Sequence, residues 1–167
     1  MPFLLRTIRK SKWYNHEGTS WLAEGELQAD ALDDLKTINN SLSVWLVDDN
    51  RENLEQVVIA FAANRSDLAQ VDYVLFDKKI LSDLNIKFEK SPGDTPNEEV
   101  NLNWHMDLVE LTASKRFELA MTIMAKAEKA RVSKKTIERQ ILEAVKSKQL
   151  NLDKMDDTLQ TKIRPQI

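Results

Sequence analysis

Short apolar runs and helical spacings alternate along the first ninety residues. The runs at 3–10, 42–47 and 71–76 are rich in branched and aromatic side chains, which predicts strands. Apolar residues in 22–39 and 52–64 return every three or four positions, which predicts amphipathic helices. A strand, a helix and a strand at this spacing indicate a βαβ unit, so we expect two of the strands to be parallel.

The pattern changes after residue 90. Residues 78–84 predict a short helix and 86–89 a candidate edge strand, and then 91–103 gathers two of the four prolines and one of the three glycines. We interpret this segment as a surface loop and a candidate boundary. Beyond it, 104–130 and 134–148 predict helices. The first of these two helices is expected to carry one apolar stripe, made of Ala113, Phe117, Ala120, Met124 and Ala127.

These elements predict an α/β fold, with an α+β arrangement as the alternative. We expect a three- to four-stranded sheet with flanking helices over 1–100 and a helical hairpin packed on it over 101–150. A polar, loosely ordered tail is expected over 151–167. Asn39 and Asn40 suit a helix C-terminus, because Asn tolerates the left-handed conformation.

Charge is unevenly distributed along the 167 residues, although the net charge is only −3. Residues 1–20 carry a net +3, residues 21–110 a net −12 and residues 111–167 a net +6. An acidic body between basic segments suggests two surfaces with different tasks, or two surfaces that attract each other. The acids expected to meet a basic protein partner are Glu24, Glu26, Asp30, Asp33 and Asp34.

Several chemistries lack the residues they need. The chain has no cysteine, which removes disulfides, thiolate metal sites and thiol nucleophiles. The glycines are Gly18, Gly25 and Gly93, too far apart for a phosphate-binding loop. The apolar start is interrupted by Arg6, and no run approaches the ~20 apolar residues of a membrane helix. We therefore predict a cytoplasmic protein with no cofactor and no membrane association.

The best enzymatic alternative uses carboxylates at strand ends. Asp48 and Asp77 each follow a predicted strand, and on neighbouring parallel strands they could share a magnesium ion for phosphoryl or phosphodiester hydrolysis. Asp77 and Lys79 also have the D-x-K spacing of many nuclease sites. The competing interpretation is ordinary turn chemistry, which we favour. His16 and His105 are interpreted as structural residues, and no motif marks a Ser–His–Asp triad.

A second alternative is nucleic-acid binding by the basic final third. Residues 121–141 resemble a helix-turn-helix, with Ala127 at the small-residue position and Val132–Ser133 in the turn. Arg131 stands where glycine is usual in that motif. The competing interpretation is a solvated basic helix pair that complements the acidic body. The residues that would contact nucleic acid are Lys134, Lys135, Thr136 and Arg139.

Taken together, these patterns favour a non-catalytic protein-binding or regulatory module. It would act as an immunity-type or accessory subunit of a multi-protein system, with a protein partner favoured over nucleic acid. Trp45 is expected in the core. Trp13, Trp21 and Trp104 adjoin predicted loops, where they either seal the core or anchor a partner.

Overall fold

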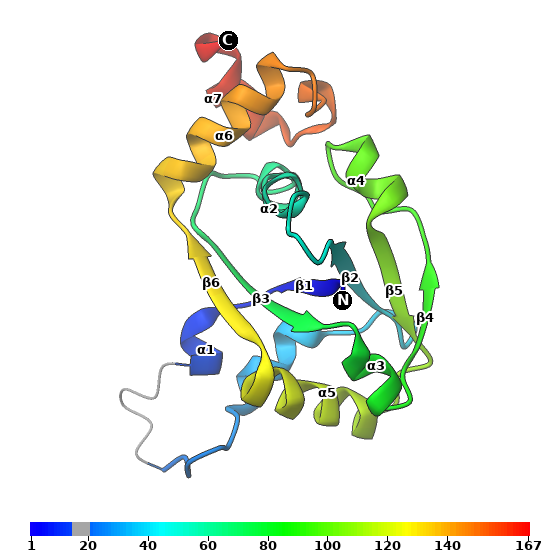
Figure 1. The fold of residues 1–167 in the computed structure, drawn as a ribbon. Helices are drawn as coiled ribbons and strands as arrows, with labels where there is room; N and C mark the ends of the chain where they lie inside the picture. Colours follow the sequence, from blue (N-terminus) through cyan, green and yellow to red (C-terminus); the bar gives the residue numbers. More distant parts are fainter. Residues whose placement is uncertain (15–20) are drawn as a thin grey trace.

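Six short strands pair into one antiparallel sheet at the centre of the molecule (Figure 1). The computed structural model describes residues 1–14 and 21–167. The strand order is β4-β5-β2-β1-β3-β6. The strands are β1 (Phe3–Thr7), β2 (Leu42–Val47), β3 (Val71–Asp77), β4 (Lys87–Lys90), β5 (His105–Val109) and β6 (Glu128–Val132).

The position of β1 explains why the sheet is antiparallel. Phe3 pairs with Val47 of β2 on one side and with Asp77 of β3 on the other. Because both pairings are antiparallel, β2 and β3 run in the same direction, and α2 (Leu54–Ala63) connects them. The expected parallel pair is therefore not a pair of neighbours, since β1 lies between the two strands. The fold is α+β, and the predicted three- to four-stranded sheet is corrected to six strands.

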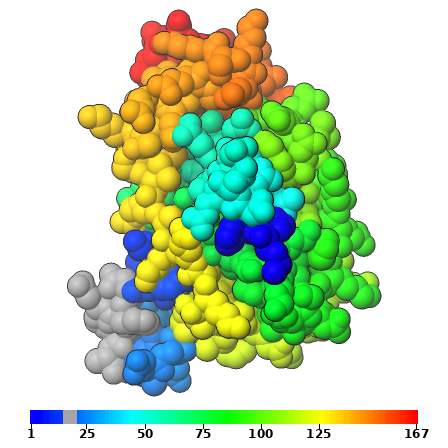
Figure 2. Space-filling view, in the orientation of Figure 1, coloured from blue at the N-terminus to red at the C-terminus, as the bar shows by residue number. Residues whose placement is uncertain are grey.

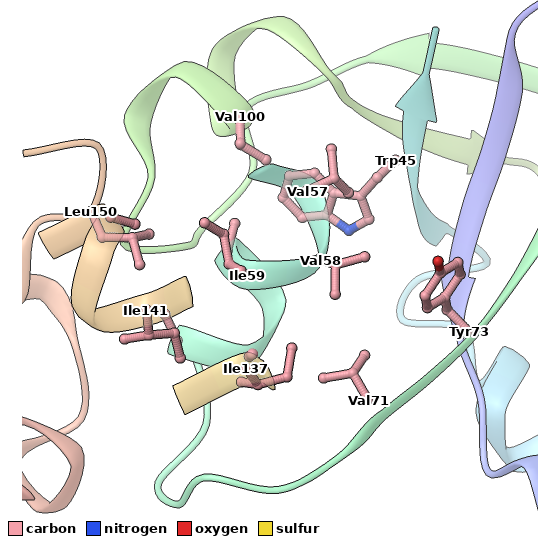
Figure 3. Close-up of a cluster of buried hydrophobic side chains, with 14 of the residues drawn as sticks. Trp45, Val57, Val58, Ile59, Val71, Tyr73, Val100, Ile137, Ile141 and Leu150 are labelled. Atoms are coloured by element: carbon pink, nitrogen blue, oxygen red, sulfur yellow. The ribbon is translucent and has the colours of Figure 1, made fainter. Parts of the chain in front are cut away.

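Helices cover both faces of the sheet (Figure 1). On one face, α2, α4 (Glu98–Asn103), α6 (Lys134–Lys146) and α7 (Asp157–Ile163) enclose a core with β-strand residues such as Leu5 and Trp45. Figure 3 shows this cluster, in which Ile137 and Ile141 of α6 face α2. On the other face, residues such as Leu4 and Val44 pack against α1 (Lys10–Tyr14), η1 (Ala29–Leu35), α3 (Lys79–Asp83) and α5 (Ala113–Lys126). Leu4 and Leu5 belong to different clusters because successive side chains of a strand point to opposite faces of the sheet.

The C-terminal part of the chain belongs to the same sheet, which corrects the predicted helical hairpin. Residues 105–109 and 128–132 are strands, and α5 and α6 pack on opposite faces. The strand β6 has only two apolar residues, Ala130 and Val132, which pack half-buried against the core on the α2 face, so its pairing with β3 was not visible in the hydrophobic pattern. Its charged side chains add ion pairs, including Arg131 with Asp72.

Two further segments differ from the sequence-based expectation. The predicted helix over 22–39 is reduced to the 3-10 helix η1, and Asn39 and Asn40 form a two-residue hairpin turn between Ile38 and Ser41. Both asparagines are left-handed, with φ values of 52° and 59°, as this type of turn requires. The predicted loose tail instead contains η2 (Leu152–Lys154), α7 and η3 (Arg164–Gln166). Leu159 and Ile163 of α7 are fully buried in the core. None of the described helices is both long and apolar enough to span a membrane.

Candidate functional site

Three of the five acids expected to meet a partner contact the protein's own N-terminal segment. Arg9 Nε lies 2.8 Å from Asp34 Oδ1, and Arg9 Nη2 lies 3.5 Å from Asp33 Oδ2. Lys12 Nζ lies 2.9 Å from Asp30 Oδ2, and this hydrogen bond lowers the pKa of Asp30. The attraction between the basic start and the acidic body is therefore partly satisfied inside the molecule.

Asp34 is the acid that anchors α1 on η1. Its side chain is 12% exposed, and its Oδ2 accepts hydrogen bonds from the Arg9 main-chain N at 2.8 Å and from Trp13 Nε1 at 2.9 Å. Trp13 is fully buried. Of the two roles that the sequence left open for it, sealing the core or anchoring a partner, it therefore has the first. Because α1 is held this way, Tyr14 at its end is also positioned.

The other two acids, Glu24 and Glu26, are exposed and line a groove of about 460 Å3. Trp13 and Tyr14 line it from α1, while Met121, Met124 and Ala125 line it from α5. Lys129 of β6 completes the lining. We call this surface the Met–Glu groove. In Figure 2 the residues near position 25 (blue) and the yellow end of α5 with β6 both lie toward the lower left.

The Met–Glu groove is built from fixed elements. The Tyr14 hydroxyl donates to the Ile123 carbonyl oxygen at 3.3 Å, which links α1 to α5. Lys129 Nζ lies 4.1 Å from the centre of the Tyr14 ring, a cation–π contact. Glu26 Oε2 accepts from the Ala23 main-chain N at 2.9 Å, and Gly25 has a φ of 82°, which a side-chain-bearing residue adopts only with strain. The two acids are thus carried on a locally structured turn.

The predicted stripe of α5 is confirmed only in part: Ala120 is buried and Met124 and Ala127 pack against the core, whereas Ala113 and Phe117 are exposed. The face that packs on the sheet is Leu119, Ala120 and Ile123. Phe117, a member of the predicted apolar stripe, is 53% exposed, one helical turn from the half-buried Met121. Trp21, which precedes the acidic turn, is 71% exposed, so it does not seal the core. Exposed aromatic side chains and methionine next to each other are typical of protein interfaces.

Both tyrosines of the chain have raised pKa values, which leads to a testable prediction. Burial raises the pKa of Tyr14, and burial together with the negative charge of Glu128 raises that of Tyr73. The unfolded chain ionises near the ordinary value of 10.0, whereas the folded protein keeps both protons to higher pH. We therefore expect stability to fall as pH rises above about 10. Tyrosinate absorbance should titrate later in the native protein than in urea, and coincident curves would contradict this assignment.

The strand-end carboxylates do not meet. The premise that their strands are neighbours is wrong, because Phe3 of β1 lies between β2 and β3. At the usual strand spacing, β2 and β3 are therefore about 10 Å apart. Asp77 Oδ1 accepts from the Lys79 main-chain N at 2.8 Å and starts α3, and the Asp48 main-chain N donates to Asn53 Oδ1 at 2.9 Å. Both aspartates therefore form turns. Within residues 1–14 and 21–167, no three histidine or acidic side chains are grouped to hold a metal ion.

The segment 121–141 is not a helix-turn-helix. Strand β6 occupies the place of the turn, so the helices on either side cannot pack together. Ser133 caps α6, since its Oγ accepts from the Thr136 main-chain N at 3.2 Å. Thr136 Oγ1 is also within 2.9 Å of Ser133 Oγ. Lys134, Lys135 and Arg139 are exposed at the start of α6. That they contact nucleic acid stays a prediction, although the helix-turn-helix on which it was based is absent from this segment.

A serine, a histidine and an aspartate do come together on β5 and the loop after β4. Ser91 Oγ lies 3.0 Å from His105 Nδ1 and donates to Asp107 Oδ2 at 2.7 Å, while His105 is buried against Trp45. In a catalytic triad the carboxylate holds the imidazole, which then contacts the serine. Here Ser91 contacts both other groups, so the arrangement ties the loop to the sheet. His105 begins a strand rather than a helix, and His16 lies outside the described residues.

Comparison with known proteins returned no match: no family model, curated protein or solved structure is significantly similar to this chain.

Proposed function

We propose that this protein is a protein-binding module whose Met–Glu groove holds a basic, amphipathic segment of a partner. The observation that carries the proposal is the groove itself, which is lined by Glu24 and Glu26 together with Met121 and Met124. Such a module acts on another protein, which suits a regulatory, accessory or immunity-type subunit of a multi-protein system.

The lining explains which segment would fit. Methionine is flexible and polarisable, so a wall of Met121 and Met124 adapts to apolar side chains of different shapes. Glu24 and Glu26 outnumber Lys129, so the lining carries a net negative charge that favours Lys or Arg on the partner. The exposed Phe117 extends the apolar surface along α5. A partner segment with apolar side chains on one face and basic side chains on the other is complementary to both features.

Charge reversal at the rim tests the proposal. The probe is a synthetic amphipathic peptide of Leu and Lys, measured by fluorescence anisotropy beside a matched peptide of Leu and Glu. We expect the basic peptide to bind more tightly, and Glu24→Lys with Glu26→Lys to weaken it about tenfold, because each reversal replaces attraction by repulsion at an exposed site. Rising salt should weaken binding by the basic peptide, chiefly through the association rate.

A matched control and an apolar variant separate groove binding from general attraction. Glu52→Lys with Asp67→Lys makes the same charge change at exposed positions flanking α2, on the other side of the sheet. This variant should keep most of its affinity. Met121→Ser should weaken binding several-fold while leaving the far-UV circular dichroism unchanged. Equal loss of affinity in the groove variant and the control, or equal affinity for the two peptides, would refute the proposal.

A further inference from the structure

Arg6 carries a charge that the described protein does not pair. It lies in the middle of β1, where its Nε donates to the Asp34 main-chain O at 2.9 Å and its Nη1 to the Ser43 main-chain O at 2.8 Å. No ion pair of Arg6 occurs within the described part of the chain. Burial lowers the pKa of Arg6, and the charge of Asp34 offsets part of this effect. A largely buried cation without a carboxylate partner is costly, and proteins usually supply a counter-charge.

A cavity of about 340 Å3 opens beside this guanidinium. It is lined by Arg6, Lys36, Ile38, Ser41, Ser43 and Asp107, at the end of β2 where the Asn39–Asn40 turn enters the sheet. The side chains of Lys36 and Ser41 make no hydrogen bond or ion pair to any described residue. Arg6 Nη2 is likewise without a described partner. Three donor groups at this cavity, two of them cationic, therefore have no partner among the described residues.

Asp107 forms the opposing charge of the cavity, and its oxygens are already engaged. Ser43 Oγ donates to Oδ1 at 2.8 Å and Ser91 Oγ donates to Oδ2 at 2.7 Å. The hydroxyl proton of Ser43 is thus directed at Asp107 and is not offered to a ligand. With Arg6 and Lys36 against one carboxylate, the cavity carries a net positive charge.

From these contacts we propose that the cavity binds a small free oxyanion, a carboxylate or phosphate group, through Arg6, Lys36 and Ser41. The planar guanidinium presents paired N–H donors that match such groups, and the ammonium and hydroxyl supply further donors. The cavity volume is at the small end of ligand sites, which fits a low-molecular-weight anion. This site lies apart from the Met–Glu groove and does not depend on the function proposed for it.

The test is a titration with sodium phosphate, and separately with sodium acetate, at constant ionic strength set by sodium chloride. The main-chain amide signals of Ser41 and Ser43 in NMR spectra are expected to shift and saturate with at least one of the two anions. Lys36→Ala should weaken binding about fivefold, because a unit charge near the anion is lost. Asp107→Asn should tighten binding by a similar factor, because it removes a repelling charge and keeps the shape.

The control is Lys146→Ala, which removes an exposed ammonium from α6 on the other face of the sheet and should leave the affinity unchanged. Arg6→Gln should abolish saturation if the variant folds, as checked by circular dichroism. If Arg6→Gln does not fold, Lys36→Ala and Asp107→Asn still test the proposal. Shifts that never saturate with either anion, an unchanged affinity in Lys36→Ala, or weaker binding in Asp107→Asn would each overturn the proposal.

Discussion

Replacing Asp34 with Ala is expected to lower the free energy of unfolding by about 3 kcal/mol, because two charge-assisted hydrogen bonds to Arg9 are lost together with that to Trp13. The Trp13 indole N–H would remain in a fully buried ring without its acceptor. Arg6 would also lose the nearby negative charge that offsets its burial. Urea unfolding followed by tryptophan fluorescence measures the loss.

Asp33→Ala is the matched control for Asp34→Ala. Asp33 is the neighbouring residue on η1, but its side chain is 72% exposed and its oxygen lies 3.5 Å from Arg9 Nη2. An exposed ion pair of this kind contributes about 0–1 kcal/mol, so this substitution should hardly change the unfolding curve. If both variants lost the same stability, the anchoring role of Asp34 would be wrong. Because Asp34 holds α1, its loss should also weaken peptide binding in the Met–Glu groove.

The contrast between Asp33 and Asp34 shows how far sequence reasoning reaches. The opposite charges of the N-terminal segment and the acidic body suggested that the two could attract each other, as they do at Arg9 and Lys12. The sequence could not show which acids pair inside the protein, because that depends on the short helix η1 and on the burial of Trp13. Glu24 and Glu26, in contrast, are exposed on the turn before this helix.

Burial made β2 and β3 predictable but not β5, whose Met106 and Leu108 are buried although residues 105–109 were expected to be helical. The predicted strand at 42–47 coincides with β2, and 71–76 falls one residue short of β3, because both strands are apolar on both faces. Strand β6 was missed because it is an edge strand whose only apolar residues are Ala130 and Val132, too few to mark a strand. The place of β1 between β2 and β3 could not be predicted from the sequence, since it depends on pairing between residues far apart in the chain. That single pairing separates Asp48 from Asp77.

The sequence predicted the acids of the Met–Glu groove but not its methionine wall. The acids stand out by charge, whereas Met124 was assigned to an apolar stripe together with Phe117. Helical spacing identifies a face within about one residue on either side, and here the packed face is Leu119, Ala120 and Ile123. Phe117 and Met121 therefore fall on the neighbouring, accessible face. The sequence cannot place the packed face of α5 more closely than this, because that face depends on how α5 is rotated against the sheet.

Replacing Gly93 with Ala is the other change expected to have a large effect, a loss of about 2–3 kcal/mol. A Cβ at this position would lie 2.4 Å from Cη2 of Trp45 and 3.0 Å from Oδ1 of Asn101. Trp45 is buried and meets Phe61 and His105 edge-on, with ring centres 4.9 Å and 4.6 Å away, so its ring has little room to move.

The loop could not move aside without a further cost. The Gly93 main-chain N donates to the Asn101 O at 2.9 Å, and the buried Asn101 side chain bonds to Thr95 through both of its polar atoms. A displaced Gly93 would strain this buried network, in which unsatisfied polar groups are costly. Gly25→Ala is the comparison at an uncrowded site, where no atom of the described residues lies within 4 Å of the new Cβ. The positive φ opposes a side chain there, at about 1 kcal/mol.

A double-mutant cycle identifies the clash as the cause. Trp45→Phe removes the outer ring atoms, including Cη2, that the new methyl group would meet. Gly93→Ala should therefore cost less in the Trp45→Phe protein than in the natural sequence, by about 1 kcal/mol or more. Urea unfolding of the four proteins gives this coupling. If Gly93→Ala costs the same in both backgrounds, crowding against Trp45 is not what requires glycine there. The cost would then arise from the main-chain network of Asn101 and Thr95, and Asn101→Ala should reduce it instead.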